Sequence, residues 1–292
     1  MRRSMLFLPG NNPNMLINAA SLMADAVIFD LEDAVSPAEK DAARILVRNT
    51  IKYTDLSECE VIVRINSVDT PYWKLDIDAI LPERPSLILL PKTAAPSDVN
   101  TVADYMSEVE ERAGITVGTV GIMPLIETAL GVENSFSIAS CERVRALFLG
   151  GEDLTADLQC KRTKEGKEIE YARTRLVVAA RAAGVDVYDT PFTDVNDDEG
   201  IVNDTMFAKS LGFTGKASIS PRHVEVINEI FSPTAAEIEY AYEVIDAIRL
   251  AKAQGKGAIS LRGKMIDAPI VARAERTIAM AAALGLARED SQ

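Results

Sequence analysis

The segment VIFDLEDAV, residues 27–35, combines the features that decide the fold of this chain. Its first half is a short apolar run of the kind that forms a buried β-strand, and its second half carries the carboxylates Asp30, Glu32 and Asp33. In an extended segment Asp30 and Glu32 lie on one face, because successive side chains point to opposite sides. Carboxylates this close repel each other unless a cation or an arginine lies between them. The segment therefore predicts a strand that ends beside a positive charge.

A helix start follows the acidic residues. Ser36, Pro37 and Glu39 fit a capping box, with proline at the first helical position. We expect a helix to begin there. Because Asp30 and Glu32 come before this cap, helix capping does not explain them.

The pattern of a short apolar run followed by an amphipathic segment recurs along the chain. Continuous apolar strands that alternate with helices indicate a parallel sheet covered by helices. Eight such units fit a (β/α)8 TIM barrel better than a doubly wound sheet, which would normally open with a glycine-rich phosphate loop that PGNNPN does not provide. The eight runs are SMLFLP (4–9), AVIFDLE (26–32), VIVRIN (61–66), SLILLPK (86–92), VGIMPLIE (120–127), RALFLGGED (145–153), VDVYDTPF (185–192) and GKASIS (215–220).

The residues after the eighth run exceed what the last helix of a barrel needs. We expect residues 1–230 to form the barrel catalytic domain and residues 231–292 an extra C-terminal helical segment. The segment contains the helical pattern SPTAAEIEYAYEVIDAIRLAKAQ, the glycine-punctuated stretch GKGAISLRGKMID and a last helix in APIVARAERTIAMAAALG. Its helices are apolar on one face, so we expect the segment to pack on its own barrel or on a neighbouring subunit.

Composition excludes several classes of protein. The net charge of −13 argues against nucleic acid or an anionic membrane as the main partner, and no apolar run approaches the ~20 residues that span a bilayer. The apolar run in MRRSMLFLPG is shorter than the ~7–15 residues of a signal peptide, so we expect a first strand and a cytoplasmic protein.

The few cysteines and the single histidine limit the metal sites that the chain can build. Cys59, Cys141 and Cys160 are widely spaced and do not form a metal-ligand pattern, so we expect buried free thiols. His223 is the one histidine, which excludes a zinc site built from several histidines. Any metal site would have oxygen ligands.

Polar residues stand at the ends of most of the predicted strands. In a (β/α)8 barrel the catalytic groups come from the C-terminal ends of the strands, which meet at one mouth. Capping a helix or facing water is the alternative for each, and we retain it for Lys92 and Asp189. The residues at these ends are Asp30, Glu32, Arg64, Lys92, Glu127, Glu152, Asp153 and Asp189.

Three of these ends suggest how an anionic ligand could bind. Two carboxylates, Glu127 and Asp153, suit Mg²⁺, which keeps water ligands and takes others from its substrate. Arg64 lies in a strand that should be buried, where a lone guanidinium is costly. It could pair with Glu32 or grip a substrate carboxylate through two nitrogens. Together these groups suggest chemistry on a chelated keto acid.

Nine motifs follow one another along nearly the whole chain: RRSMLFLPG, FDLEDAV, VRIN, LPK, PLIETALGV, LGGEDLTADL, DVNDDEG, LGFTGKASISPRH and SLRGKMID. In this order and spacing they resemble the citrate lyase β-subunit family. That family belongs to a larger group of Mg²⁺-dependent barrel aldolases and lyases, which includes malyl-CoA and citramalyl-CoA lyases. The resemblance implies a homotrimer of barrels that cleaves a 3-hydroxyacyl thioester; for citrate lyase, citryl-acyl-carrier-protein gives an acetyl thioester and oxaloacetate.

The resemblance also implies roles for residues of the mouth. Glu127 and Asp153 would bind Mg²⁺, with Mn²⁺ as a substitute. Arg64 would bind the carboxylate of the keto acid. The backbone of Gly151, Glu152 and Asp153 would add hydrogen bonds to it.

Two further roles follow from the same resemblance. Asp30 and Glu32 would form an acidic floor beside the metal and hold Arg64. Asp267 would be the catalytic acid or base, delivered into the site of a neighbouring subunit by the C-terminal segment. From the sequence alone, Asp267 reads as an N-cap before Pro269.

The substrate stays open between several thioesters. Leu154 follows Asp153 where citrate lyase β subunits tend to have an aromatic residue, and NSVDTPYW (66–73) is close to a motif of malyl-CoA lyases. A stand-alone malyl-CoA or citramalyl-CoA lyase is therefore an alternative, with acyl-CoA rather than an acyl-carrier protein as the donor. An alternative of another class is a non-catalytic scaffold subunit of a larger lyase complex, although a scaffold has no need for Arg64, Glu127 and Asp153 together.

Overall fold

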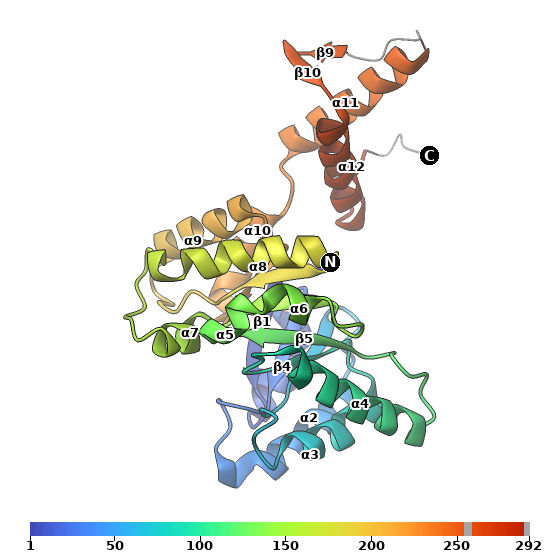
Figure 1. The fold of residues 1–292 in the computed structure, drawn as a ribbon. Coiled ribbons are helices and arrows are strands. Elements are labelled where there is room, and N and C mark those ends of the chain that lie inside the picture. The colour runs from blue at the N-terminus through green and yellow to red at the C-terminus, as the bar shows by residue number, and fades with distance from the viewer. Residues whose placement is uncertain (254–258, 289–292) are drawn as a thin grey trace. The chain divides into compact units, whose positions relative to one another are not determined.

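The computed structural model describes residues 1–253 and 259–288, and its main element is a closed barrel of eight parallel strands in chain order. Figure 1 shows helices such as α4 and α8 lying outside these strands. The (β/α)8 expectation is therefore confirmed. The strands are β1 (Ser4–Pro9), β2 (Ala26–Asp30), β3 (Glu60–Arg64), β4 (Leu87–Leu90), β5 (Gly121–Ile126), β6 (Ala146–Leu149), β7 (Asp186–Asp189) and β8 (Gly215–Ser218).

Helices follow each strand and cover the outside of the barrel. Five short 3-10 turns also occur among the described residues. None of the helices in the described ranges is long and apolar enough to cross a membrane. The helices are α1 (Pro13–Ile17), α2 (Lys40–Tyr53), α3 (Trp73–Ile80), α4 (Pro96–Arg112), α5 (Ala129–Glu133), α6 (Ser135–Ala139), α7 (Gly151–Asp157), α8 (Glu170–Ala183), α9 (Asp198–Leu211), α10 (Val224–Phe231), α11 (Ala235–Ala253) and α12 (Ala268–Ala283).

The barrel interior is filled by every second residue of the strands. Because side chains alternate along a strand, one set packs inside the barrel and the other against the helices. Both sets are apolar, which explains why the strands read as continuous apolar runs. The inner cluster consists of Met5, Ala26, Ile28, Ile62, Leu87, Leu89, Met123, Leu125, Ala146, Phe148, Tyr188 and Ala217, with Phe7 packed against it.

The register between β2 and β3 decides the position of the first charges. Asp30 is the direct partner of Arg64, as Ile28 is of Ile62. The inner-face pattern of Ile28 and Ile62 therefore continues to Asp30 and Arg64, at the C-terminal ends of their strands.

Two expected local structures differ from the prediction. The capping box does not form: Ser36 Oγ donates to the Glu39 carboxylate, residues Pro37–Glu39 form a 3-10 turn, and α2 begins only at Lys40. The sixth strand ends at Leu149, and the predicted remainder of that run becomes the first turn of α7. A glycine at the helix N-cap, Gly150, allows this change of direction without a side chain in the way.

A second compact unit begins at Ile230, whereas the barrel unit spans Arg2–Glu229. In it α11 and α12 pack on each other, and a hairpin of β9 (Ile259–Leu261) and β10 (Lys264–Ile266) precedes α12 (Figure 1). The GKG part of the predicted glycine-punctuated stretch, residues 255–257, lies outside the described residues. The domain assignment 1–230 and 231–292, and the surface on which the extension packs, stay predictions.

The apolar face of the C-terminal helices is used within this unit. Ala241 and Val244 of α11 pack with Ala274 of α12 and with Ile266 of the hairpin. The apolar faces of α11 and α12 therefore cover each other to a large extent.

The cysteines are free thiols, as expected, but they are not buried. Cys59 and Cys141 are half-buried and Cys160 is exposed. The expectation of buried thiols was wrong because all three lie in or beside connecting segments rather than on strands.

Candidate active site at the mouth of the barrel

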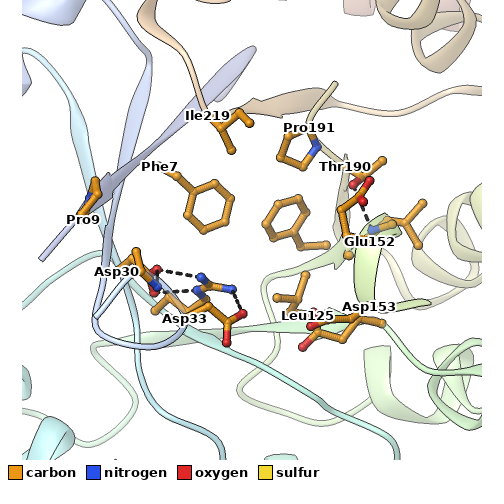
Figure 2. A pocket seen from close by; sticks show the side chains of 17 residues that line it. Phe7, Pro9, Asp30, Asp33, Leu125, Glu152, Asp153, Thr190, Pro191 and Ile219 are labelled. Carbon is orange, nitrogen blue, oxygen red and sulfur yellow. Dashed lines mark hydrogen bonds and ion pairs between the residues drawn. The ribbon is translucent and has the colours of Figure 1, made fainter. Parts of the chain in front are cut away.

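A cavity of about 460 Å³ opens at the C-terminal ends of the strands. Figure 2 shows Asp30 and Asp33 on one side of it and Glu152 and Asp153 on the other. Its wall is largely apolar and aromatic, with a few charged groups converging on it, as is typical of a small-molecule site. The apolar lining consists of Phe7, Pro9, Ala34, Leu125, Phe148, Leu149, Pro191 and Ile219.

Asp30 lines this cavity, and each of its carboxylate oxygens accepts two hydrogen bonds. Its Oδ1 accepts from Arg64 Nε (2.7 Å) and from the Glu32 amide (2.8 Å). Its Oδ2 accepts from Arg64 Nη2 (2.7 Å) and from the Ala34 amide (3.0 Å). Asp30 therefore shapes the loop after β2 and orients the guanidinium of Arg64.

Arg64 is surrounded by carboxylates. Besides the two bonds to Asp30, its Nη1 lies 3.0 Å from Glu32 Oε2 and 3.4 Å from Asp33 Oδ2. Burial lowers the pKa of Arg64, but the bonds to Asp30 and the nearby charges more than offset this, so its pKa is raised. The contacts leave one N–H of Nη2 without a partner among the described residues. The principal partner of Arg64 is thus Asp30, with Glu32 second.

Two lysines also neutralise the acidic loop. Lys40, buried at the start of α2, donates from Nζ to the carbonyls of Leu31 and Glu32, both at 2.7 Å. Lys92, after β4, places its Nζ 3.1 Å from Glu32 Oε1. Burial raises the pKa of Glu32, and the charges of Arg64 and Lys92 oppose that rise. The carboxylates of residues 30–33 are therefore tolerated because three cations surround them.

Glu127 is, like Asp30, a buried carboxylate of the cavity wall. It is 3% exposed, and its Oε1 accepts from the Lys92 amide at 2.6 Å. Burial raises the pKa of Glu127 to about 8, a rise that the Lys92 amide opposes and the nearby Asp153 carboxylate strengthens. A Cβ on Gly150 would lie 2.6 Å from Glu127 Oε2, so only glycine there leaves the carboxylate its place.

Asp153 is exposed in the first turn of α7, beside Glu152. The start of that helix is held by Thr190, whose Oγ1 accepts from the Gly151 amide at 2.9 Å. The Gly151 N–H is therefore already used. Of the three backbone amides expected to contact a ligand, those of Glu152 and Asp153 remain.

The pair Glu127 and Asp153 fits a hard divalent cation. Both carboxylates line the cavity, and burial together with the charge of Asp153 raises the pKa of Glu127. A cation bound between them would favour the ionised form of both. Mg²⁺ suits such a set because it retains waters and needs few protein ligands. Within residues 1–253 and 259–288, the structure forms no group of three or more His, Cys, Asp or Glu residues that could hold a metal. A zinc-type protein cage is therefore absent from this part of the chain.

Five of the residues considered from the sequence are not among those that line the cavity: Glu32 and Lys92, whose contacts are described above, and Asp189, His223 and Asp267. Asp189 points away from the barrel axis and pairs with Arg173 and Lys216 in a fully buried ion network. His223 is buried, packs near the ring of Phe192 and is not among the lining residues. Asp267 is the N-cap of α12, where its Oδ1 accepts from the Ile270 amide at 3.2 Å.

The cavity also contains residues that sequence reasoning missed. Phe7, Phe148 and Ile219 form its apolar wall, and Thr190 fixes α7. The first two lie on the inner face of their strands, so the alternation of side chains along each strand could have located them. No local signal marks Thr190, because its role comes from a contact with a residue 39 positions away.

Comparisons with known proteins agree with this geometry. The sequence profile of the HpcH/HpaI aldolase/citrate lyase family matches residues 3–221. Citrate lyase subunit beta of Leuconostoc mesenteroides subsp. cremoris is 43% identical over 282 residues, which cover 96% of this chain and 93% of that protein. The mitochondrial citramalyl-CoA lyase of Homo sapiens is 32% identical over 296 residues, covering 97% and 86%.

A solved structure is also similar to this chain in its fold. The crystal structure of CitE from Mycobacterium tuberculosis, in complex with magnesium, acetoacetate and coenzyme A, superposes with a TM-score of 0.78 at 27% identity. The match covers 96% of this chain and 98% of that one. With a family profile over three quarters of its length and relatives over nearly all of it, the chain belongs to the HpcH/HpaI aldolase/citrate lyase family.

Proposed function

We propose that this chain is a magnesium-dependent carbon–carbon lyase that cleaves a 3-hydroxyacyl thioester into an acetyl thioester and a keto acid. The observation that carries the proposal is the buried Glu127, which shares one cavity with Asp153 and Arg64 at the mouth of the barrel. Relatives named citrate lyase subunit beta and citramalyl-CoA lyase support the reaction class. A purely structural subunit would have no use for this arrangement.

Glu127 and Asp153 are the proposed ligands of Mg²⁺, with Mn²⁺ as a substitute. The magnesium in the related CitE structure supports the choice of this ion. When bound, the ion would supply Lewis-acid polarisation of the substrate. The Lys92 amide holds Glu127 in place, and Gly150 leaves room for its carboxylate.

Arg64 is proposed to orient the carboxylate of the keto acid. Its remaining Nη2 N–H has no partner among the described residues, and its Nη1 has its longest contact with Asp33, whose side chain is 58% exposed. If Asp33 turns into solvent, Nη1 and Nη2 form a planar pair of donors for a carboxylate. The amides of Glu152 and Asp153 would add hydrogen bonds, while Asp30 and Glu32 keep Arg64 in place.

Asp267 is the proposed acid or base, acting on the acetyl carbon. Cleavage leaves an acetyl-thioester enolate that needs a proton, and a carboxyl group outside the chelate can supply it. The side chain of Asp267 is exposed at the start of α12. We propose that it serves a neighbouring subunit in a cytoplasmic homotrimer, which can be part of a larger lyase complex.

The first candidate substrate is citryl-acyl-carrier-protein or citryl-CoA, which would release oxaloacetate. Citrate lyase subunits that are 36–43% identical support it. The wall formed by Phe7, Leu125 and Phe148 favours a second candidate, citramalyl-CoA. Its product pyruvate would place a methyl group there, whereas oxaloacetate brings a second carboxylate that is costly to bury without a partner.

Calorimetry with Mn²⁺ and Mg²⁺ tests the metal site. We expect weak binding that tightens when pyruvate or oxaloacetate is added, because the site offers few protein ligands. Glu127→Gln and Asp153→Asn should each lower metal affinity by about tenfold or more. Glu111→Gln, which removes an exposed carboxylate on α4, is the matched control. Unchanged affinity in both site variants would contradict the proposal.

Turnover of citryl-, malyl- and citramalyl-CoA with Mg²⁺ tests the substrate. Activity on citryl thioesters alone, or only after addition of an acyl-carrier protein, supports a citrate lyase subunit. Turnover of malyl- or citramalyl-CoA supports a stand-alone lyase. No keto-acid release from any of them, with or without the carrier protein, would contradict the proposed reaction.

A further inference from the structure

The turn after β4 places one residue between two carboxylates of the cavity. The backbone N–H of Lys92 donates to Glu127 Oε1 at 2.6 Å, and the ammonium of the same residue lies 3.1 Å from Glu32 Oε1. Glu127 follows β5, whereas Glu32 lies in the loop after β2. Lys92 therefore links two parts of the mouth that are far apart in the chain.

The backbone of Lys92 is in a conformation that disfavours a long side chain. Its φ angle is +53°, in the left-handed region that glycine enters without steric cost. Side chains held in this region tend to occur at functional sites, where surrounding contacts fix them. A glycine would satisfy the backbone of this turn, so the presence of lysine points to a use for the side chain itself.

The ammonium of Lys92 supplies a second positive charge beside the Glu32 carboxylate. Glu32 is buried, and neither of its carboxylate oxygens is in hydrogen-bond geometry with a described donor. Its other cation, Arg64, is also bonded to Asp30 and Asp33. One guanidinium thus faces three carboxylates, and Lys92 is the second cation in contact with the Glu32 carboxylate among the described residues.

The side chain of Lys92 acts from the rim rather than on a ligand. It is 45% exposed and is not among the residues that line the cavity. Its ammonium contacts the Glu32 carboxylate, and the contact of Lys92 to Glu127 is made by the backbone N–H. The contacts therefore describe a residue that holds other groups in place.

We propose that Lys92 is a positioning residue of the active site: its N–H fixes the Glu127 carboxylate and its ammonium holds Glu32 against Arg64. The inference rests on the proposed function, because it takes Glu127 to be a metal ligand. Without the ammonium, the Glu32 carboxylate would have Arg64 as its one contacting cation among the described residues and would draw that guanidinium away from Asp30. This change disturbs the spacing between the guanidinium and the metal ligands.

Three variants test the role of the Lys92 side chain, and all three retain the backbone N–H that donates to Glu127. Lys92→Met removes the charge and keeps the unfavourable φ angle, Lys92→Arg keeps both, and Lys92→Gly removes both. We expect Lys92→Met and Lys92→Gly to bind Mn²⁺ about tenfold more weakly or worse, because residues that orient metal ligands have effects of this size. With the thioester substrate, kcat should fall more than KM, and Lys92→Arg should restore most of the loss.

Thermal unfolding provides a readout that is independent of activity. Lys92→Gly should melt about 2 °C or more above Lys92→Met, because the backbone penalty is relieved. Lys52→Met, an exposed lysine on α2, is the control and should match the wild type in Mn²⁺ affinity. If Lys92 only stabilised the fold, Mn²⁺ affinity would follow stability, and Lys92→Gly would bind Mn²⁺ more tightly than Lys92→Met.

Several results would overturn the inference. Lys92→Met that binds Mn²⁺ and turns over like the wild type would show that the ammonium positions nothing. Lys92→Arg as impaired as Lys92→Met would show that charge is not the property used, and Lys92→Gly no more stable than Lys92→Met would remove the backbone argument. A wild-type protein that binds neither Mn²⁺ nor a keto acid would instead refute the proposed function, and this inference with it.

Discussion

Arg64 combines a structural and a binding role in one side chain. Its bonds to Asp30 join β2 to β3, and its side chain lines the cavity, where Nη1 contacts Glu32 and Asp33. Removing one partner of a buried, doubly bonded ion pair is strongly destabilising, because the other charge is left uncompensated. A change at Arg64 is therefore expected to affect both the fold and keto-acid binding, and the two effects have to be measured separately.

His223 is a second residue whose environment makes a measurable prediction. It is 1% exposed, and burial lowers its pKa below the usual value, with a further contribution from the charge of Arg222. The folded state therefore favours the neutral imidazole, whereas the unfolded chain takes up a proton below about pH 6.5. Stability should fall as the pH drops through that value, because the unfolded state then binds more protons.

Urea unfolding of the wild type and of His223→Gln at pH 7.5 and 5.5 measures this effect. The difference in unfolding free energy between the two proteins should shrink or reverse toward pH 5.5. Only the wild type has a histidine that is neutral when folded and takes up a proton when unfolded. As the chain has one histidine, its proton NMR signal can be followed directly and should give a pKa below the usual value of a histidine. A pH-independent difference would contradict the prediction.

The element that sequence reasoning misassigned, α7, is also the one that presents Asp153. Its first residue, Gly151, donates to Thr190 at the end of β7, and the Thr190 carbonyl accepts from Lys216 of β8 at 2.6 Å. A Cβ on Gly151 would lie 2.9 Å from Thr190 Oγ1, so the two segments are in direct contact. The position of Asp153 therefore depends on two neighbouring strands.

Thr190→Val tests this dependence because valine has the same shape as threonine but offers no acceptor. We expect its unfolding free energy to fall by about 1–3 kcal/mol, since the Gly151 N–H is left unpaired, and its Mn²⁺ affinity to fall several-fold. Thr190→Ser retains the hydroxyl and should bind Mn²⁺ like the wild type. Urea unfolding and calorimetry measure both quantities, and equal Mn²⁺ affinity in the valine and serine variants would show that this contact does not position α7.

At the scale of the whole molecule, the question is which barrel Asp267 serves. Within its own unit it caps α12, which explains its presence without any catalytic role. The apolar faces of α11 and α12 pack on each other, so they give less support for a reach to a neighbouring subunit than their sequences suggest. A functional experiment is therefore required.

Mixed oligomers provide that experiment. Asp267→Asn should abolish turnover and leave Mn²⁺ and keto-acid binding nearly intact, because this carboxyl acts outside the chelate. Mixing Asp267→Asn with Arg64→Ala subunits should restore some activity. Some sites then combine the intact Arg64 of one subunit with the intact Asp267 of its neighbour. The Arg64→Ala protein must first be shown to be folded by circular dichroism. No recovery in subunits shown to exchange would mean that Asp267 acts in its own subunit or only caps the helix.

The sequence by itself determined the barrel and its mouth. Eight apolar runs separated by helical segments leave few other arrangements, because strands buried on both faces need helices on their outer side. The residue types at the strand ends likewise predicted that Arg64 and Glu127 would meet in one cavity, as they do. These conclusions depend only on local periodicity and on the rule that the strand ends converge.

Only the tertiary structure decided which partner each charge takes. The register of β2 and β3 pairs Arg64 with Asp30. The turn after β4 places Lys92, a second cation, beside Glu32, and the Gly151 amide donates to the distant Thr190. The physical reason is that hydrogen bonds and ion pairs depend on distances of a few tenths of an ångström between separate elements. Register, burial and close packing set those distances, and no local pattern of residues records them.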